Sequence, residues 1–309
     1  MKNTLFFLFM FICFQFTYAQ FSGKIVYQFE YQTKNNLPLE DVLEGTKIDS
    51  VSYTINEKAY KSVSYSNGEI IEEYVYDPAS KKMLFSMGNR PYYLYLKTDL
   101  EKFKSDVKLQ IDHTHTKDFL GYSAYKTTHP TTGEINYYSD EITIDTSRFS
   151  KHYFMQWNEI LKQTKGGIPL KTITKHNGYT EIKTAVNIEK QAINEMDFSF
   201  DEEKMQVAAY NNLDEVIDFP DLKDRGFWCY QAVVEQNSNR LIDGKDYQLI
   251  LRFVIHPDGK ITHIEIEESD YEYLNEAAKQ IIETCDLGFE PGLINGLPVS
   301  SEIYYPINF

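Results

Sequence analysis

The residues whose types and spacing best suit metal chemistry lie in the segment Asp112-His113-Thr114-His115. Residues two apart on a β-strand face the same way, so the two imidazoles could share an ion. A structural zinc site needs four ligands, and no third or fourth ligand can be nominated from this sequence. The segment is also polar, which favours a solvated strand or loop end. We therefore expect no metal site here.

Two cysteines near the C-terminus, Cys229 and Cys285, are the other reactive candidates. They could form a disulfide, act as a thiol pair, or be two small buried side chains, and the sequence leaves these alternatives open. The chain has no Gly-x-Ser-x-Gly elbow, His-Glu-x-x-His helix, P-loop or dinucleotide-binding glycine pattern. Because no nucleophile and base can be paired, we expect neither a catalytic residue nor a cofactor.

The charge balance excludes two classes of partner. The 309 residues carry 46 acidic and 31 basic side chains, for a net charge of −15. Nucleic-acid binding needs a basic surface that displaces counterions, and docking on anionic lipid needs clustered lysine and arginine. The sequence has no such stripe, so we expect no nucleic acid as a partner.

The first residues have the pattern of an export signal. Lys2 precedes an apolar run over residues 5–16, and Thr17 and Ala19 place small side chains three and one residues before Gln20. The run is shorter than the roughly 20 residues that span a bilayer. Residues 1–19 are therefore predicted to be a cleaved signal peptide, and the mature protein is predicted to reside in the oxidising periplasm.

Residues 20–200 are predicted to form an antiparallel β domain. Ile25, Tyr27, Phe29 and Tyr31 alternate at the period of a strand, and similar runs follow. Asn67-Gly68 is a strong signal for a tight hairpin. Only residues 149–161 have helical spacing, and the pattern there is weak.

Three segments of this region resemble the GLPGLI family of secreted proteins. They are residues 118–128 (DFLGYSAYKTT), residues 133–142 (GEINYYSDEI) and the Gly-Gly-Ile-Pro-Leu turn at 166–170. The resemblance implies a half-barrel of the LolA type, a shape that can shelter an acyl chain. The sequence departs from the family where Gly-Ile-Pro-Leu-Lys replaces Gly-Leu-Pro-Gly-Leu-Ile, and where the cysteine often found after the Gly-Tyr pair is missing.

A polar stretch, residues 201–221, is predicted to link this domain to a second one at 222–309. The second domain has a helical pattern from Phe227, a strand over residues 247–255 and a strand over residues 261–266, joined by a His-Pro-Asp-Gly turn. A helix ending before Gly288 and a strand at the C-terminus complete the order α-β-β-α-β. The fold class is therefore predicted to be α+β.

This order of helices and strands, together with the short motifs within them, resembles the TonB C-terminal domain. The resemblance implies a Gram-negative periplasmic module that docks other proteins. The Tyr-Pro-x-x-Ala segment usual before the first strand is absent, as are a retained membrane anchor and a Pro-rich linker, so we expect no energy transduction by this chain. The matching positions are Phe253, Pro257, Asp258, Gly259, Ala277, Phe289, Pro291, Gly292, Asn295, Gly296, Pro298, Val299, Pro306, Ile307 and Phe309.

In the TonB family the last strand lies at the sheet edge, where a partner adds a strand by backbone pairing. Pro306 agrees with an edge because it has no N–H for a ladder. The alternatives are that the module's first helix, the linker or a second copy covers this edge. The predicted partner-binding strand consists of Ile303, Tyr304, Tyr305, Pro306, Ile307, Asn308 and Phe309.

The function predicted from these features is a non-catalytic periplasmic adaptor that binds a protein in the periplasm or at the outer membrane. The alternative is a carrier that holds a lipid or another lipophilic ligand in the first domain. An enzyme with a site built from scattered residues is the third and weakest hypothesis. A homodimer is compatible with the sequence.

Overall fold

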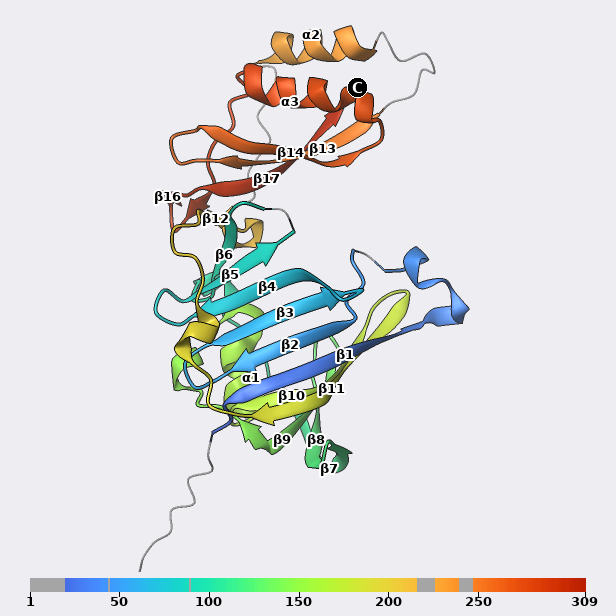
Figure 1. Ribbon diagram of the computed structural model, residues 1–309, viewed down its shortest axis with the longest axis vertical. Coiled ribbons are helices and arrows are strands. Elements are labelled where there is room, and N and C mark those ends of the chain that lie inside the picture. Colours follow the sequence, from blue (N-terminus) through green and yellow to red (C-terminus); the bar gives the residue numbers. More distant parts are fainter. Residues whose placement is uncertain (1–19, 44, 89, 216–225, 239–246) are drawn as a thin grey trace, which may run out of the picture.

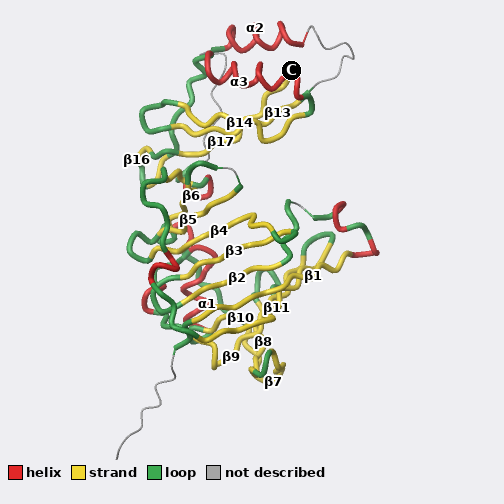
Figure 2. Tube along the Cα trace, in the orientation of Figure 1, coloured by secondary structure: helices red, strands yellow, loops and turns green. Residues whose placement is uncertain are grey.

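The computed structural model describes residues 20–43, 45–88, 90–215, 226–238 and 247–309, so the predicted signal peptide lies outside the described residues. The fold is α+β and rich in strands, as the sequence predicts, and fifteen strands form one continuous sheet (Figures 1 and 2). In the described ranges, none of the helices has the length and apolar character needed to cross a bilayer.

The first eleven strands pair antiparallel in the order β6-β5-β4-β3-β2-β1-β11-β10-β9-β8-β7. This sheet curves around helix α1 (Figure 1). Strand β1 lies between β2 and β11, which brings the start and end of this part together. The bounds are β1 (Gly23–Thr33), β2 (Ser50–Ile55), β3 (Tyr60–Ser66), β4 (Glu69–Asp77), β5 (Lys82–Met87), β6 (Tyr93–Lys97), β7 (Gln110–Phe119), β8 (Tyr122–Thr128), β9 (Ile135–Thr143), β10 (Gly167–Lys175) and β11 (Tyr179–Lys190).

Local patterns explain much of this sheet. Ile25 and Tyr27 are buried on the inner face of β1, as the alternation predicts. Asn67 and Gly68 join β3 to β4 with φ of 51° and 83°. A two-residue hairpin turn needs positive φ at both positions, which Asn-Gly tolerates best.

The weak helical pattern at residues 149–161 is only partly realised. Helix α1 (Trp157–Gln163) begins later than predicted, because Met155 and Gln156 before it have φ of 52° and 61°, outside the right-handed helical region. Short 3-10 turns surround it and recur elsewhere. They are η1 (Lys34–Asn36), η2 (Leu39–Asp41), η3 (Glu101–Phe103), η4 (Ser147–Phe149), η5 (Phe154–Gln156), η6 (Glu195–Phe198), η7 (Tyr210–Asn212) and η8 (Glu272–Leu274).

The C-terminal module has the predicted order α-β-β-α-β, with one small hairpin added. Helices α2 and α3 lie on one face of the strands β14-β13-β17 (Figure 1). The buried core between these layers includes Phe253, Ile281 and Ile307. The bounds are α2 (Phe227–Ser238), β13 (Gln248–Ile255), β14 (Ile261–Ser269), α3 (Asn275–Thr284), β15 (Leu293–Ile294), β16 (Leu297–Pro298) and β17 (Ser301–Asn308).

The stretch predicted to be a linker contains a short strand, β12 (Gln206–Ala208), that joins the two parts into one sheet. It pairs in parallel with β6 along all three of its residues, and with β17 between Ala208 and Ser301. Val207 is fully buried and packs with Tyr92 and Leu94 of the first part and Val254 of the module. Residues 206–208 are therefore part of the contact between the two units. Whether the units fold independently stays a prediction.

Candidate functional site

The predicted docking strand, β17, is paired along one side by β13 over its whole length, from Ser301–Ile255 to Asn308–Gln248. Tyr247 and Phe309 exchange both backbone hydrogen bonds, at 3.2 and 2.9 Å. Hydrogen-bonded and non-hydrogen-bonded pairs alternate along an antiparallel ladder. The N–H groups of Tyr305 and Ile307 therefore point to β13, whereas those of Glu302, Tyr304 and Asn308 point away from it.

In the part of the chain that the structure describes, a strand pairs with the outward side of β17 at its start only, and at its end the hydroxyl of Tyr230 on α2 donates to the carbonyl of Asn308 at 3.5 Å. Among the described residues, pairing on this side is confined to Ser301, where the Ala208 N–H donates to the carbonyl of Ser300 at 2.7 Å. After Ala208 the chain turns off, and the Ala209 N–H donates to Tyr95 instead. In the described ranges, no strand pairs with the outward backbone of Tyr304 and the residues after it, and we call this position beside the sheet the β17 lane. Pro306 lies at an outward position, so its missing N–H costs no bond to β13.

The prediction that the last strand is an edge strand is wrong in part, because β17 lies between β13 and β12, and β12 belongs to the stretch predicted to be the linker. The strand at the end of the sheet in the module is β14. Its register against β13 shifts twice, between Ile250 and Leu251 and between Arg252 and Val254. Such bulges twist an edge and hinder further pairing. Strand β17 has no register shift against β13, so its regular backbone is better suited to pairing with an added strand than that of β14.

A buried charge cluster fixes β17 to the first part of the chain. Glu302 is 3% exposed, and its carboxylate accepts from Arg90 Nε at 2.8 Å and from the Tyr92 hydroxyl at 2.6 Å. Arg252 Nη1 lies 3.5 Å from the same carboxylate and donates to the Tyr92 hydroxyl at 2.9 Å. Burial alone would raise the pKa of Glu302, but the hydrogen bonds from Arg90 and Tyr92 and the two arginine charges lower it overall.

Arg252 is held from a second side by the module itself. Its Nη2 and Nε donate to Glu265 and Glu267 of β14 at 2.9 and 2.8 Å. Arg90 also donates to the hydroxyl of Tyr304 at 2.6 Å, so the first part reaches the start of the β17 lane. The sequence analysis missed this cluster. Its signal was a charged residue, Arg252, inside an almost wholly apolar strand, since a buried arginine needs a partner.

Cys229 and Cys285 form a disulfide between α2 and the end of α3, which resolves the open alternatives in favour of the bond. The Cα atoms are 5.6 Å apart. Cys285 belongs to the module core, together with Leu287 and Phe309. The bond therefore ties the outer helix α2 to the rest of the module.

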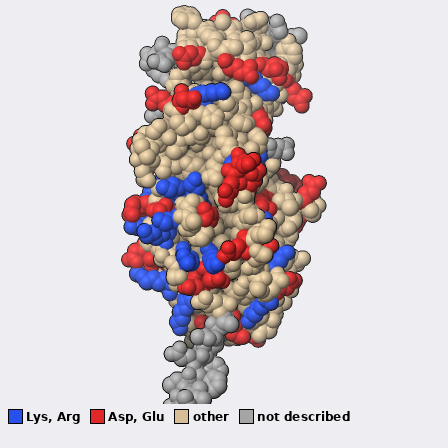
Figure 3. Space-filling model, turned by 60° about the vertical axis from the view of Figure 1, so that its left-hand side comes forward, with Lys and Arg blue, Asp and Glu red and all other residues tan. Residues whose placement is uncertain are grey.

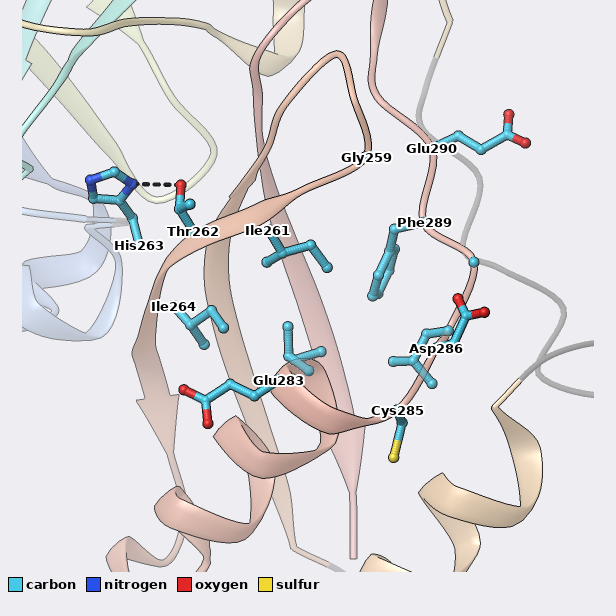
Figure 4. Close-up of a pocket in the computed structure, with 13 residues that line it drawn as sticks. Gly259, Ile261, Thr262, His263, Ile264, Glu283, Cys285, Asp286, Phe289 and Glu290 are labelled. Carbon is cyan, nitrogen blue, oxygen red and sulfur yellow. Dashed lines mark hydrogen bonds between the residues drawn. The ribbon is translucent and has the colours of Figure 1, made fainter.

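A groove of about 900 Å³ lies beside β14, between the hairpin turn at Gly259 and the segment that follows α3 (Figure 4). Ile261 and Phe289 face each other across it, and Glu283 and Glu290 lie on its rim. The groove is separate from the β17 lane, which lies on the other side of β13.

The first part holds a cavity of about 320 Å³ on the inner face of its curved sheet, closed by the segment from Met155 to α1. Tyr27, Tyr53 and Tyr138 line it together with Trp157. Burial raises the pKa of all three tyrosines, so their hydroxyls remain protonated. The aromatic walls thus present neutral hydroxyl groups, and two charged residues, Glu134 and Lys183, also line the cavity.

The predicted metal-like residues lie on β7, at the opposite end of the sheet from the module. His115 Nδ1 lies 2.5 Å from Asp112, whereas His113 packs on Tyr125 with ring centroids 4.5 Å apart. The two imidazoles have different neighbours and are not brought together on one ion. In the described ranges, no group of three or more His, Cys, Asp or Glu side chains is arranged to hold a metal.

On the face shown in Figure 3, basic and acidic side chains are interspersed.

Comparisons with known proteins support the C-terminal assignment. Residues 243–309 match the family described as Gram-negative bacterial TonB protein C-terminal. The match starts later than the predicted boundary at 222, so α2 and Cys229 lie outside it. A comparison with curated proteins finds no match.

Three solved structures align with parts of this chain. PNGF-II is 11% identical with a TM-score of 0.39, and the alignment covers 77% of this chain and 44% of that one. LolA superfamily protein NE2245 from Nitrosomonas europaea is 8% identical with a TM-score of 0.28, covering 59% and 91%. LprF from Mycobacterium bovis is 11% identical with a TM-score of 0.23, covering 56% and 88%.

This chain therefore spans less than half the length of PNGF-II. The family match is specific to the module and agrees with its motifs. The segment from residue 243 to 309 is thus similar to the TonB C-terminal family.

Proposed function

We propose that this protein is a non-catalytic adaptor of the bacterial envelope whose module binds a partner protein by strand addition in the β17 lane. The observation that carries the proposal is the outward direction of the Tyr304 and Asn308 N–H groups, beside a strand position that none of the described strands occupies. Strand β12 already uses the start of this position by pairing in parallel at Ser301. A partner strand would continue where β12 leaves off.

The available length suits a short extended segment. Residues 304–308 span about 16 Å at roughly 3.3 Å per residue. Tyr304 and Asn308 can donate, and the carbonyl groups of Tyr304 and Pro306 can accept. Each such bond contributes about 0.5–1.5 kcal/mol net, so the backbone gives moderate affinity and side-chain contacts must supply the rest.

Export to the periplasm is part of the proposal, because the TonB C-terminal family is Gram-negative and the first residues have the pattern of a signal peptide. Removal of residues 1–19 would leave a mature chain that starts at Gln20. The intact mass of the protein purified from the periplasmic fraction tests this. A mass that includes Met1 to Ala19 would contradict it.

The test of docking is partner capture by three forms of the full mature chain. The wild-type protein and the variants Tyr304→Pro and Tyr304→Phe are immobilised and exposed to periplasmic and outer-membrane fractions of the source bacterium. The proline removes an outward N–H, whereas phenylalanine keeps the N–H and removes only the hydroxyl that contacts Arg90. We expect the proline variant to bind the captured protein roughly tenfold or more weakly.

Equal binding by Tyr304→Pro and wild type would contradict docking in the lane, provided that circular dichroism shows the variant to be folded. Loss of binding in Tyr304→Phe alone would assign recognition to the side chain. Capture of a second copy of this chain would identify a homodimer, which sedimentation of the purified protein would then show directly.

A second candidate function is a carrier of a small lipophilic ligand. The observation in its favour is the 320 Å³ cavity with tyrosine and tryptophan walls in the first part of the chain. Ligand pockets are concave and largely apolar with a few polar groups, and this volume lies at the low end of their range. Thermal stabilisation of the protein by lipids extracted from the envelope tests the carrier, and an unchanged melting temperature would contradict it.

A further inference from the structure

The cavity of the first part contains one cationic side chain, Lys183 of β11. Lys183 is partly buried, and its Nζ lies 5.1 Å from the centre of the Tyr27 ring, which also lines the cavity. Within the described part of the chain, Lys183 forms no ion pair. Burial lowers the pKa of its ammonium group, and the carboxylates of Glu134 and Glu181 oppose that shift. A cation in such a place gains from an anion that completes its contacts.

The nearest acidic lining residue, Glu134, is already engaged. Its carboxylate accepts from Asn136 Nδ2 at 2.7 Å and from the Thr174 hydroxyl at 3.3 Å. Asn136 is fixed in turn by the Thr172 hydroxyl, which donates to its amide oxygen at 2.7 Å. These bonds hold the Glu134 carboxylate in a polar row across β9 and β10. The donors that hold this carboxylate are an amide and a hydroxyl, and in the described ranges it forms no ion pair with Lys183.

The segment that borders the cavity has an unusual backbone. Met155 lines the cavity but is 73% exposed, and both Met155 and Gln156 have positive φ. Two consecutive non-glycine residues in this region are costly, and such strain concentrates at ligand sites. The Gln156 side chain is held by His129 Nε2 at 2.9 Å. The exposed thioether thus lies where an apolar chain would enter.

The size of the cavity limits the ligand. A volume of 320 Å³ equals the space of roughly ten liquid waters, which suits one short chain and excludes a diacyl lipid. We propose that the cavity binds a single-chain amphiphile with an anionic head, such as a medium-chain fatty acid, whose carboxylate pairs with Lys183 while its chain packs against Trp157 and Met155. This proposal rests on the carrier function and specifies its ligand.

The tryptophan content allows a direct test. The chain has two tryptophans, of which Trp157 lines the cavity and Trp228 is 80% exposed on α2. In the full mature chain with Trp228→Phe, emission reports on Trp157 alone. Titration with decanoate should change this emission in a saturable way, and titration with decanol, which has the same chain without the charge, should give weaker binding.

Lys183→Met keeps the length of the side chain and removes its charge, so decanoate should bind roughly 10- to 100-fold more weakly. Lys171→Met is the matched control. Lys171 neighbours the lining residue Thr172 on β10, so its side chain points to the opposite face, and decanoate affinity should stay unchanged.

Each outcome of the titrations bears on the proposal. Preference for decanoate that is lost in Lys183→Met supports it. Equal binding of decanoate and decanol, or an unchanged affinity in Lys183→Met, overturns the anionic head while leaving a neutral lipophilic ligand for the carrier. Binding of neither compound overturns both the inference and the carrier function.

Discussion

Glu302→Ala should weaken the contact between the module and the first part of the chain severely. Its carboxylate is 3% exposed and receives contacts from Arg90, Tyr92 and Arg252. Removing one member of a buried charge pair costs about 3–5 kcal/mol, because the remaining charges stay buried without their partner. At about 1.4 kcal/mol per tenfold, this equals a rise of roughly 100- to 4,000-fold in the dissociation constant between the two parts.

The assay places a protease site within residues 216–225, after β12 and before α2. The cut protein is examined by gel filtration and by calorimetric titration of the separated parts. Wild-type parts should remain together, since β12 pairs with β17 and Glu302 is buried against Arg90. Parts that carry Glu302→Ala should separate at micromolar concentration, whereas each keeps its circular dichroism spectrum.

The matched control is Glu267→Ala. Glu267 also pairs with Arg252, but its side chain is 37% exposed and lies on the module's own strand β14. The expected loss is about 0–1 kcal/mol, as for other exposed pairs. The role of Glu302 in joining the two units would be refuted if the wild-type parts separate after the cut. It would also be refuted if Glu302→Ala and Glu267→Ala weaken the association of the two parts equally.

Three further predictions concern the disulfide, a buried histidine and the docking strand. Replacing both Cys229 and Cys285 by alanine should lower the unfolding free energy by about 2–4 kcal/mol, because their sequence separation is 56; a loss below about 1 kcal/mol in urea titrations would contradict this. Burial lowers the pKa of His152 from 6.5 to about 4, so its neutral form stabilises the fold at neutral pH, and about 3 kcal/mol should be lost as the pH falls from 6.5 to 4. His152→Gln should flatten that part of the pH–stability curve, and an unchanged slope would disprove the assignment. Pro306→Ala restores an outward N–H and should tighten partner binding by up to about 1 kcal/mol, measured by calorimetry, with no change in affinity as the contrary result.

The elements that could be predicted from the sequence are those that are determined by residues close together in the chain. The alternation of Ile25 and Tyr27 defines the buried face of a strand, and Asn67-Gly68 defines a turn, because both depend on neighbouring residues alone. The match to the TonB family likewise depends on ordered local motifs around Gly259 and Gly296. These features gave the α+β class and the order of elements in the module.

The contacts between distant segments could not be predicted in the same way. Strand β12 has three residues, too few for any periodicity, and its pairing with β17 joins Ala208 to Ser301. The cluster of Glu302 with Arg90 depends on the same long-range register. Lys183 of β11 and Trp157 of α1 likewise line one cavity because the sheet curves around α1. A single sequence contains no pattern that fixes such pairings.

The most direct test of the adaptor proposal is hydrogen exchange at individual amides of β17, measured by NMR for the free protein and for its complex with the captured partner. Tyr305 and Ile307 donate to β13 and should be protected in both states. Tyr304 and Asn308 point outward and should become protected only in the complex. Rapid exchange of Tyr304 and Asn308 with the partner bound would contradict strand addition in the β17 lane.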